Sequence, residues 1–380
     1  MSAQITGQRL TGQRLTDQRQ ARFATYDAQR NFGDKAYKSL CYAPHTTLYF
    51  DIAGNARVCC HNHSFPAGNI LHQSIDEIWH GARIKALRQS LEQYEFGKGC
   101  DFCAMQAADN WFANMSMRRF DDYPIAPGVP EWPQQMEFSI SNACNLECIM
   151  CAGIWSSAIR ARREKLPKLP HLYSREFMLS LRKYLPHLKR IKFLGGEPFL
   201  VKEYYLIWDM LIEDKLTPDC HVTTNGTQLG PRVKRLLEAL PFSIAVSLDG
   251  TTKQTVERIR VNTDYDTQIR HVKYFGAYAK ERGTSFSLTF CLMRQNWHEF
   301  GDYCAFGDEL DCSVWVNTVR HPPEFGIYTM ELADLREVVR GMEFEAPRLE
   351  GRLGRNRNVW FAEFERLRRR CASLAAQQAA

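Results

Sequence analysis

The second half of the chain alternates short apolar runs with amphipathic stretches. Each run is rich in Val, Ile, Phe and Thr and ends near Gly, Asn or Asp, as buried strands bounded by turns do. The predicted strands are QMEFSI, IKFLGGEP, CHVTTNG, SIAVSLDG, SFSLTFCLM and SVWVNTV. Strands separated by helices predict an α/β fold whose parallel sheet is wound by right-handed crossovers, open or partly closed like a barrel.

The pattern is different before this regular part. Residues 1–35 include the repeats TGQRL, TGQRL and TDQRQ, which are poor in apolar positions and predict a flexible tail that is disordered or loosely helical. Residues 36–122 contain a helix candidate that begins at Ser74, with Glu77 placed to complete a capping box. The Pro-rich stretch Tyr123–Pro133 predicts a linker, so we expect the regular part to span residues 134–320.

Residues 321–380 predict a helical extension. Apolar side chains recur there at intervals of three and four, which predicts an amphipathic helix covering an open flank of the sheet. These apolar positions are Trp360, Phe364, Leu367, Cys371 and Leu374. The other face carries Arg366, Arg368, Arg369 and Arg370, which we interpret as a solvated face, with an acidic partner or RNA as the alternative.

Composition and charge exclude several classes of protein. With 380 residues and 44% hydrophobic content the chain can bury a large core. The 49 basic residues barely exceed the 43 acidic ones, for a net charge of +6, so a nucleic-acid partner is not expected. The sequence has neither a signal-like apolar segment near its start nor a run long enough to span a membrane. We expect a cytoplasmic protein.

The thirteen cysteines are unevenly spaced. Tight grouping in a reducing compartment favours metal ligation over disulfides. The grouped cysteines are Cys41, Cys59, Cys60, Cys100, Cys103, Cys144, Cys148 and Cys151, whereas Cys220, Cys291, Cys304, Cys312 and Cys371 are isolated and are expected in the core.

The stretch CNLECIMC, residues 144–151, directly follows the first predicted strand. Three thiolates spaced as C-x3-C-x2-C can hold three corners of a 4Fe-4S cluster and leave the fourth iron without a protein ligand. Zinc or inert thiols are the alternative, but a structural zinc site needs four ligands and no fourth Cys or His lies nearby in the sequence. The triplet therefore favours a cluster with an open iron.

This segment resembles the signature of radical S-adenosylmethionine (SAM) enzymes. The resemblance implies a partial (β/α)6 TIM-like barrel in which Cys144, Cys148 and Cys151 hold a 4Fe-4S cluster and SAM binds the open iron. It also implies that an electron from the cluster cleaves SAM to a 5′-deoxyadenosyl radical, which abstracts hydrogen from a substrate.

The ends of the next predicted strands carry further matches to that family. Gly195 and Gly196 allow close approach of backbone to SAM, and Glu197 can accept from its ammonium group. The remaining positions expected to contact SAM are Thr224, Asn225, Ser247, Asp249 and Arg260. Met150 stands where the family often has an aromatic residue near adenine, and its thioether can lie against the ring.

The earlier cysteines are similar to the SPASM or twitch auxiliary-cluster module of the same superfamily. The matching positions are Cys41, Gly54, Cys59, the turn Gly68-Asn69-Ile70, the helix start Ser74–Trp79, Arg88, Cys100 and Cys103. The resemblance implies a second, auxiliary 4Fe-4S cluster, with either Cys59 or Cys60 as the second ligand and a four-cysteine zinc site as the alternative. The module precedes the barrel, which departs from its more common position after it, and the extra cysteines of a two-cluster version do not follow Cys103.

The resemblance implies a radical SAM enzyme that modifies a ribosomally made peptide by cross-linking, epimerisation or oxidation. The alternatives are oxidation or rearrangement of a small molecule such as a sugar or nucleotide, and a zinc-stapled binding protein without activity. We expect an electron donor of the flavodoxin or ferredoxin type. Since the residues before Cys41 are few for a peptide-binding domain, a separate peptide-recognition protein is a further expected partner.

Overall fold

The computed structural model describes residues 16–30, 32–33, 35, 37–108, 110, 112, 115–126 and 128–379. These residues form two compact units, one made of residues 1–140 with 172–192 and the other of 141–171 with 193–380. The first unit includes residues 134–140, because a strand within residues 36–122 pairs with the first predicted barrel strand.

The first unit has strands in the order β3-β2-β1-β4-β5. They are β1 (Thr47–Asp51), β2 (Asn55–Arg57), β3 (Gly68–Asn69), β4 (Gln135–Ser139) and β5 (Arg190–Phe193), the last reaching the unit boundary. Its helices are α2 (Ala24–Ala28), α3 (Ala43–Thr46), α4 (Ile75–Trp79), α5 (Ala82–Glu92), α6 (Asp101–Ala108), η2 (Ser116–Phe120), α8 (Arg175–Ser180), η3 (Leu181–Lys183) and η4 (Leu185–His187).

Strand β1 pairs in parallel with β4, with Leu48 opposite Met136 and Phe50 opposite Phe138. The rings of Phe50 and Phe138 stack at 5.3 Å. The predicted capping box of α4 is confirmed, since the Ser74 hydroxyl accepts from the Glu77 N–H and the Glu77 carboxylate accepts from the Ser74 N–H.

The segment expected to be a flexible tail is helical over most of its described part. Residues 16–22 are helical, α2 follows, and Tyr26 and Arg30 are buried. Residues 1–15, which include the first two of the three repeats, lie outside the described residues.

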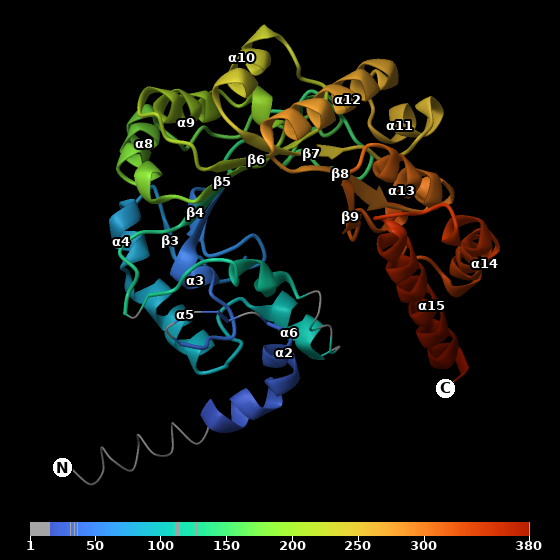
Figure 1. Cartoon of the computed structure of the whole chain (residues 1–380), viewed down its shortest axis with the longest axis horizontal. Coiled ribbons are helices and arrows are strands. Elements are labelled where there is room, and N and C mark those ends of the chain that lie inside the picture. The colour runs from blue at the N-terminus through green and yellow to red at the C-terminus, as the bar shows by residue number, and fades with distance from the viewer. Residues whose placement is uncertain are drawn as a thin grey trace. The chain divides into compact units, whose positions relative to one another are not determined.

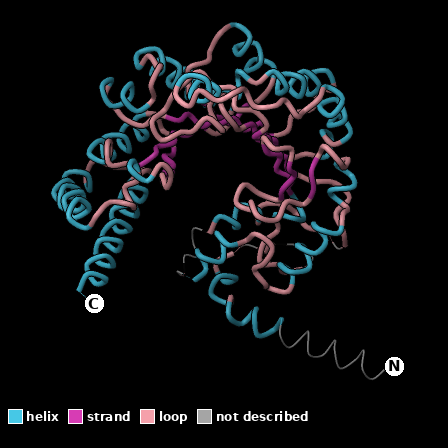
Figure 2. Tube along the Cα trace, turned by 180° about the vertical axis from the view of Figure 1, so that it is seen from behind, coloured by secondary structure: helices cyan, strands magenta, loops and turns pink. Residues whose placement is uncertain are grey.

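The second unit contains the strands β6 (Asp219–Thr224), β7 (Phe242–Ser247), β8 (Phe286–Leu292) and β9 (Ser313–Thr318), paired in parallel and in chain order. Its helices are α7 (Ser157–Arg162), η5 (Pro198–Leu200), α9 (Lys202–Glu213), α10 (Pro231–Ala239), α11 (Lys253–Ile259), α12 (Tyr265–Arg282), η6 (Trp297–Glu299), α13 (Phe300–Glu309), η7 (Pro323–Phe325), α14 (Leu332–Glu350) and α15 (Arg357–Ala379). Within this unit, α9, α10, α12 and α13 lie along one face of the strands (Figures 1 and 2).

The core on this helix-covered face is strongly aromatic. Trp208 of α9 is fully buried and meets Phe193 and Phe242 edge to face. Strand β6 alternates buried and half-buried residues, because only one of its faces packs against helices.

The predicted C-terminal helix is α15. Trp360, Phe364 and Leu367 are buried, and the helix contacts α14, α13 and the edge strand β9. The predicted α/β class with a largely parallel sheet and C-terminal helices is confirmed. Across the described residues, no helix combines the length and the apolar character that crossing a membrane requires.

Candidate functional site

The loop that follows β4 carries Cys144, Cys148 and Cys151, and its backbone is fixed at its beginning and in its middle. The Cys144 N–H donates to the Ser157 hydroxyl at 3.2 Å, and that hydroxyl donates back to the Cys144 carbonyl at 3.1 Å. The Ser156 hydroxyl donates to the Leu146 carbonyl at 2.7 Å. The start of α7 therefore clamps the beginning of the cysteine loop.

A second clamp holds the middle of the loop against residues 259–261. The Ile149 N–H donates to the Ile259 carbonyl at 2.9 Å, and the Glu147 N–H donates to the Val261 carbonyl at 3.0 Å. These two bonds flank Cys148, so its position is set by backbone rather than by its side chain alone.

Met150 packs, half-buried, against the apolar cluster of Ile259, Met293 and Val319. This contact accounts for an apolar residue before the third cysteine. The expected contact of the thioether with adenine stays a prediction.

Burial raises the pKa of all three thiols, that of Cys148 to about 12. The protein alone thus favours protonated thiols. Because a metal binds the thiolate, loading this loop must release protons and compensate the burial of negative charge.

The glycine pair after β5 lies directly against the cysteine loop. Gly195 has φ of +110°, and a Cβ on Gly196 would lie 2.3 Å from the Ala143 carbonyl oxygen. The Glu197 N–H donates to that same carbonyl at 2.7 Å. Gly196 is therefore required for close approach to the loop's own backbone, a role that the sequence did not reveal.

Glu197 follows β5, is fully buried and links this strand end to the end of β6. One carboxylate oxygen accepts from the Thr224 hydroxyl at 2.8 Å, and the other accepts from the Asn225 N–H at 2.7 Å. Each carboxylate oxygen thus already accepts a bond within the protein, and the expected contact with the ammonium group of SAM stays a prediction.

Asn225 and Thr224 are also buried. The Asn225 side-chain amide donates to Asn145 Oδ1 at 3.0 Å and lies 3.8 Å from Cys144 Sγ. Gln268, fully buried on α12, donates to the Asn225 carbonyl at 2.7 Å and to the Ser247 carbonyl at 3.2 Å. Sequence reasoning missed Asn145 and Gln268; the position of Asn145 beside Cys144 was the available signal for the first.

Burial raises the pKa of Glu197 to about 7, although bonds from Asn225, Thr224 and Phe199 oppose the shift. Because the raised pKa favours the protonated carboxyl in the folded state, its contribution to the free energy of unfolding is complete below the ordinary value near 4.5. This contribution is lost as pH rises through about 7.

We expect the free energy of unfolding of the wild type to fall by about 3 kcal/mol relative to Glu197→Gln across that window. Urea unfolding from pH 5 to pH 8 measures it. The exposed-site control Glu238→Gln should follow the wild type, and parallel wild-type and Glu197→Gln curves would contradict the prediction.

Asp249 and Arg260 form a buried ion pair. Asp249 is fully buried and Arg260 is 5% exposed, with 2.7 Å between Asp249 Oδ2 and Arg260 Nη2. Arg260 Nη1 lies 4.0 Å from Cys148 Sγ. The structure thus directs these two side chains toward each other, and the Arg260 guanidinium also toward the cysteine loop.

The first unit brings the other cysteines together around a cavity. The cavity is lined by Cys41, Cys59, Cys100 and Cys103, with apolar neighbours that include Val58 and Phe120. Burial raises the pKa of each of these thiols, to about 11 for Cys59 and about 12 for Cys100 and Cys103. Among the described residues no three Cys, His, Asp or Glu side chains converge as ligands of a single ion do. A cluster does not require that convergence, because each thiolate binds its own iron.

Cys60 is not among the residues that line this cavity. Its sulfur accepts from Arg119 Nη2 at 3.2 Å. Burial alone would raise the pKa of this thiol, but a hydrogen bond with His61 and the charge of Arg119 lower it to about 7. Cys59 and Cys60 therefore occupy different electrostatic surroundings.

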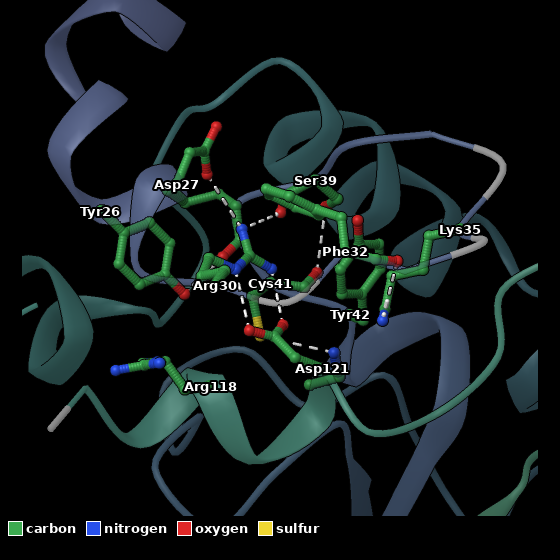
Figure 3. A network of polar contacts seen from close by, with 12 residues as sticks. Tyr26, Asp27, Arg30, Phe32, Lys35, Ser39, Cys41, Tyr42, Arg118 and Asp121 are labelled. Carbon is green, nitrogen blue, oxygen red and sulfur yellow. Dashed lines mark hydrogen bonds and ion pairs between the residues drawn. The ribbon is translucent and has the colours of Figure 1, made fainter. Parts of the chain in front are cut away.

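A buried arginine ties the N-terminal helix to the cysteine-rich region (Figure 3). Arg30 makes two bonds to the Asp121 carboxylate, at 2.9 and 2.7 Å, and donates to the Ser39 carbonyl at 2.7 Å. The Ser39 hydroxyl donates to the Cys41 carbonyl at 3.1 Å. The backbone of Cys41 is thereby held by residues outside the cysteine-rich stretch.

Comparison with known families matches two parts of the chain. Residues 138–307 match the radical SAM superfamily, and residues 41–104 match SPASM, an iron-sulfur cluster-binding domain. The two matches contain the cysteine triplet and the four cavity cysteines respectively.

Curated relatives share only part of the chain. GTP 3′,8-cyclase of Campylobacter lari is 29% identical over 130 residues, 32% of this chain and 36% of that protein. GTP 3′,8-cyclase of Aliarcobacter butzleri is 27% identical over 133 residues, 33% of this chain and 37% of that protein. The chain thus matches little more than a third of the length of these relatives.

Among solved structures, the chain is similar to Streptococcus suis SuiB bound to precursor peptide SuiA. The TM-score is 0.41 and the sequence identity is 15%, over 66% of this chain and 60% of that one. Native anSMEcpe with bound AdoMet gives a TM-score of 0.41 and 17% identity over 58% of this chain and 62% of that one.

Proposed function

Because the chain belongs to the radical SAM superfamily and carries a SPASM iron-sulfur domain before its radical SAM domain, we propose that it is an enzyme that cleaves SAM reductively to modify a substrate. The family gives it a 4Fe-4S cluster with SAM, and an auxiliary iron-sulfur cluster. When bound, these groups supply an electron and a 5′-deoxyadenosyl radical that abstracts hydrogen from the substrate.

Cys144, Cys148 and Cys151 are the proposed ligands of the SAM-binding cluster. The observation that carries this assignment is the double clamp on their loop, by Ser156 and Ser157 at one end and by residues 259–261 in the middle. A rigid loop that presents three thiolates and no fourth suits a cluster with one open iron.

The surrounding residues position the proposed SAM site. Gly195 and Gly196 let backbone pass close to the cysteine loop, where amide groups can meet the methionine end of SAM. Glu197 holds Thr224 and Asn225 at the end of β6, and Gln268 holds the carbonyl of Ser247 at the end of β7. Strand ends fixed in this way form a preorganised rim for ribose and methionine groups.

The direct test is anaerobic purification followed by metal analysis and reduction. About eight irons and eight sulfides per chain are expected from two 4Fe-4S clusters. Addition of dithionite and SAM should release 5′-deoxyadenosine. Zinc in place of iron, with no 5′-deoxyadenosine, would overturn the proposal.

For the substrate we propose a ribosomally made peptide, because SPASM-type modules accompany peptide modification. A small molecule is the second candidate, favoured by the sequence match to GTP 3′,8-cyclases. Incubation with peptides and with nucleotides, followed by counting 5′-deoxyadenosine per product, separates the two. We also propose that a flavodoxin or ferredoxin supplies the electron. A separate peptide-recognition protein would bring the peptide substrate to the enzyme.

Cys41, Cys59, Cys100 and Cys103 are the proposed ligands of the auxiliary cluster, with Cys60 outside the set. We expect Cys59→Ser to lower iron to about four atoms per chain and Cys60→Ser to leave about eight. Iron analysis of matched anaerobic preparations measures this. If Cys60→Ser loses iron and Cys59→Ser does not, the assignment of the adjacent pair is reversed.

A further inference from the structure

The buried pair of Arg260 and Asp249 stands beside the proposed SAM-cluster ligand Cys148. Arg260 is pinned through its backbone, since the neighbouring carbonyls of Ile259 and Val261 accept from the cysteine loop on both sides of Cys148. Its side chain is pinned by Asp249 at 2.7 Å. These contacts therefore hold the Arg260 guanidinium in one position.

Asp249 is itself fixed by the sheet. Its Oδ1 accepts from the Cys291 N–H at 2.7 Å, and its backbone carbonyl accepts from Asn296 Nδ2 at 2.9 Å. Asp249 follows β7 and Cys291 lies in β8, so two neighbouring strand ends determine where the carboxylate points. The pair is a preset charge arrangement.

The positively charged member of this pair lies next to the sulfur of Cys148. Arg260 Nη1 lies 4.0 Å from Cys148 Sγ, whereas Nη2 is turned to Asp249. Reduction of an iron-sulfur cluster adds negative charge that is shared with its thiolate ligands, and nearby charge and bonds to sulfur set its potential. Because Arg260 is only 5% exposed, water screens the interaction of its charge with the sulfur only weakly.

We infer that Arg260, oriented by Asp249, is a positioning residue that favours the reduced state of the cluster held by Cys148. The inference rests on the proposed function, because it requires a cluster on the cysteine loop. It assigns Arg260 to the cluster rather than to the carboxylate of SAM, since both Nη atoms are already directed within the protein.

The test is a reductive titration of the anaerobic holoenzyme followed by electron paramagnetic resonance. Addition of SAM identifies the relevant signal, because only the cluster with an open iron binds SAM. We expect Arg260→Gln to make reduction less favourable by about tenfold, which is 59 mV for a one-electron couple. Asp249→Asn removes a negative charge and should shift the potential in the opposite direction.

The double variant Arg260→Gln with Asp249→Asn removes both charges, so its potential should lie between those of the single variants. Arg260→Lys keeps the charge but cannot reach both partners, so part of the shift should remain. If Arg260→Gln fails to assemble the cluster, the opposite shift in Asp249→Asn and the partial shift in Arg260→Lys still decide the question. Equal potentials, or shifts of one sign in every variant, overturn the inference.

Arg163→Gln is the matched control. Arg163 donates to the carbonyls of Glu147 and Cys148 at 3.1 Å but is exposed to solvent, so its charge is screened and its removal should shift the potential less. A shift as large as that of Arg260→Gln would overturn the inference. An unchanged potential in Arg260→Gln, together with weaker SAM binding measured by calorimetry, would also overturn the inference. Absence of the SAM-sensitive signal in the wild type would instead refute the proposed function.

Discussion

Replacing Cys144, Cys148 and Cys151 together with alanine should lower the iron content of anaerobically purified protein from about eight to about four atoms per chain. Release of 5′-deoxyadenosine with dithionite and SAM should fall to the level of a sample without protein. The physical reason is that the auxiliary set has four cysteines around its cavity, which leaves no iron open to SAM. Iron and sulfide analysis with product chromatography measures both effects.

The control is Cys371→Ala on α15, a half-buried thiol far along the chain from either set. It should keep both the iron and the reaction. The reciprocal variant, with Cys59, Cys100 and Cys103 replaced, should keep about four irons and still release 5′-deoxyadenosine. If the triple Cys144 variant retained full SAM cleavage, the open iron would have to be elsewhere.

Local patterns were enough to predict the strands of the regular part. The alternation of apolar runs and turn residues predicted all of β4 to β9, and the motif residues follow strand ends as expected. Such signals are local, because strand propensity and turn chemistry depend on neighbours in sequence.

The pairing of β1 with β4 was not predictable in the same way. The run TLYFD has the apolar character of a strand, but its partner is chosen by tertiary packing, here by the stacked rings of Phe50 and Phe138. Residues that looked like an independent module therefore share a sheet with the first strand of the regular part.

The side-chain directions at the site were also beyond sequence reasoning. Cys59 and Cys60 are adjacent in the sequence, but their side chains point in different directions. Cys59 lines the cavity, whereas the Cys60 sulfur contacts Arg119. Glu197 matched a family position, yet burial and the bonds to Thr224 and Asn225 turn it inward. A motif fixes residue type and spacing, whereas orientation depends on long-range contacts.

Arg30 was assigned to the flexible tail from composition, yet its guanidinium is buried against Asp121 and lies over the rings of Tyr26 and Phe32 at 4.7 and 4.6 Å (Figure 3). One arginine with several distant partners leaves no periodic trace in the sequence. Its contribution to stability should nevertheless be large.

We expect Arg30→Met to lower the free energy of unfolding by about 3 to 5 kcal/mol, because it leaves the Asp121 carboxylate buried without its partner. Since Ser39 joins this network to the Cys41 backbone, the variant should also lose auxiliary-cluster iron before iron of the other cluster. Urea unfolding and iron analysis after mild chelation measure the two effects.

Arg19→Met is the matched control for this prediction. Arg19 pairs with Glu95 at 2.9 Å, but their side chains are 37% and 49% exposed, so the change should cost no more than about 1 kcal/mol. The double variant Arg30→Met with Asp121→Leu removes both buried charges and should recover part of the lost stability. If Arg30→Met and Arg19→Met were equally mild, the buried network would not be what secures the N-terminal helix to the region of Cys41.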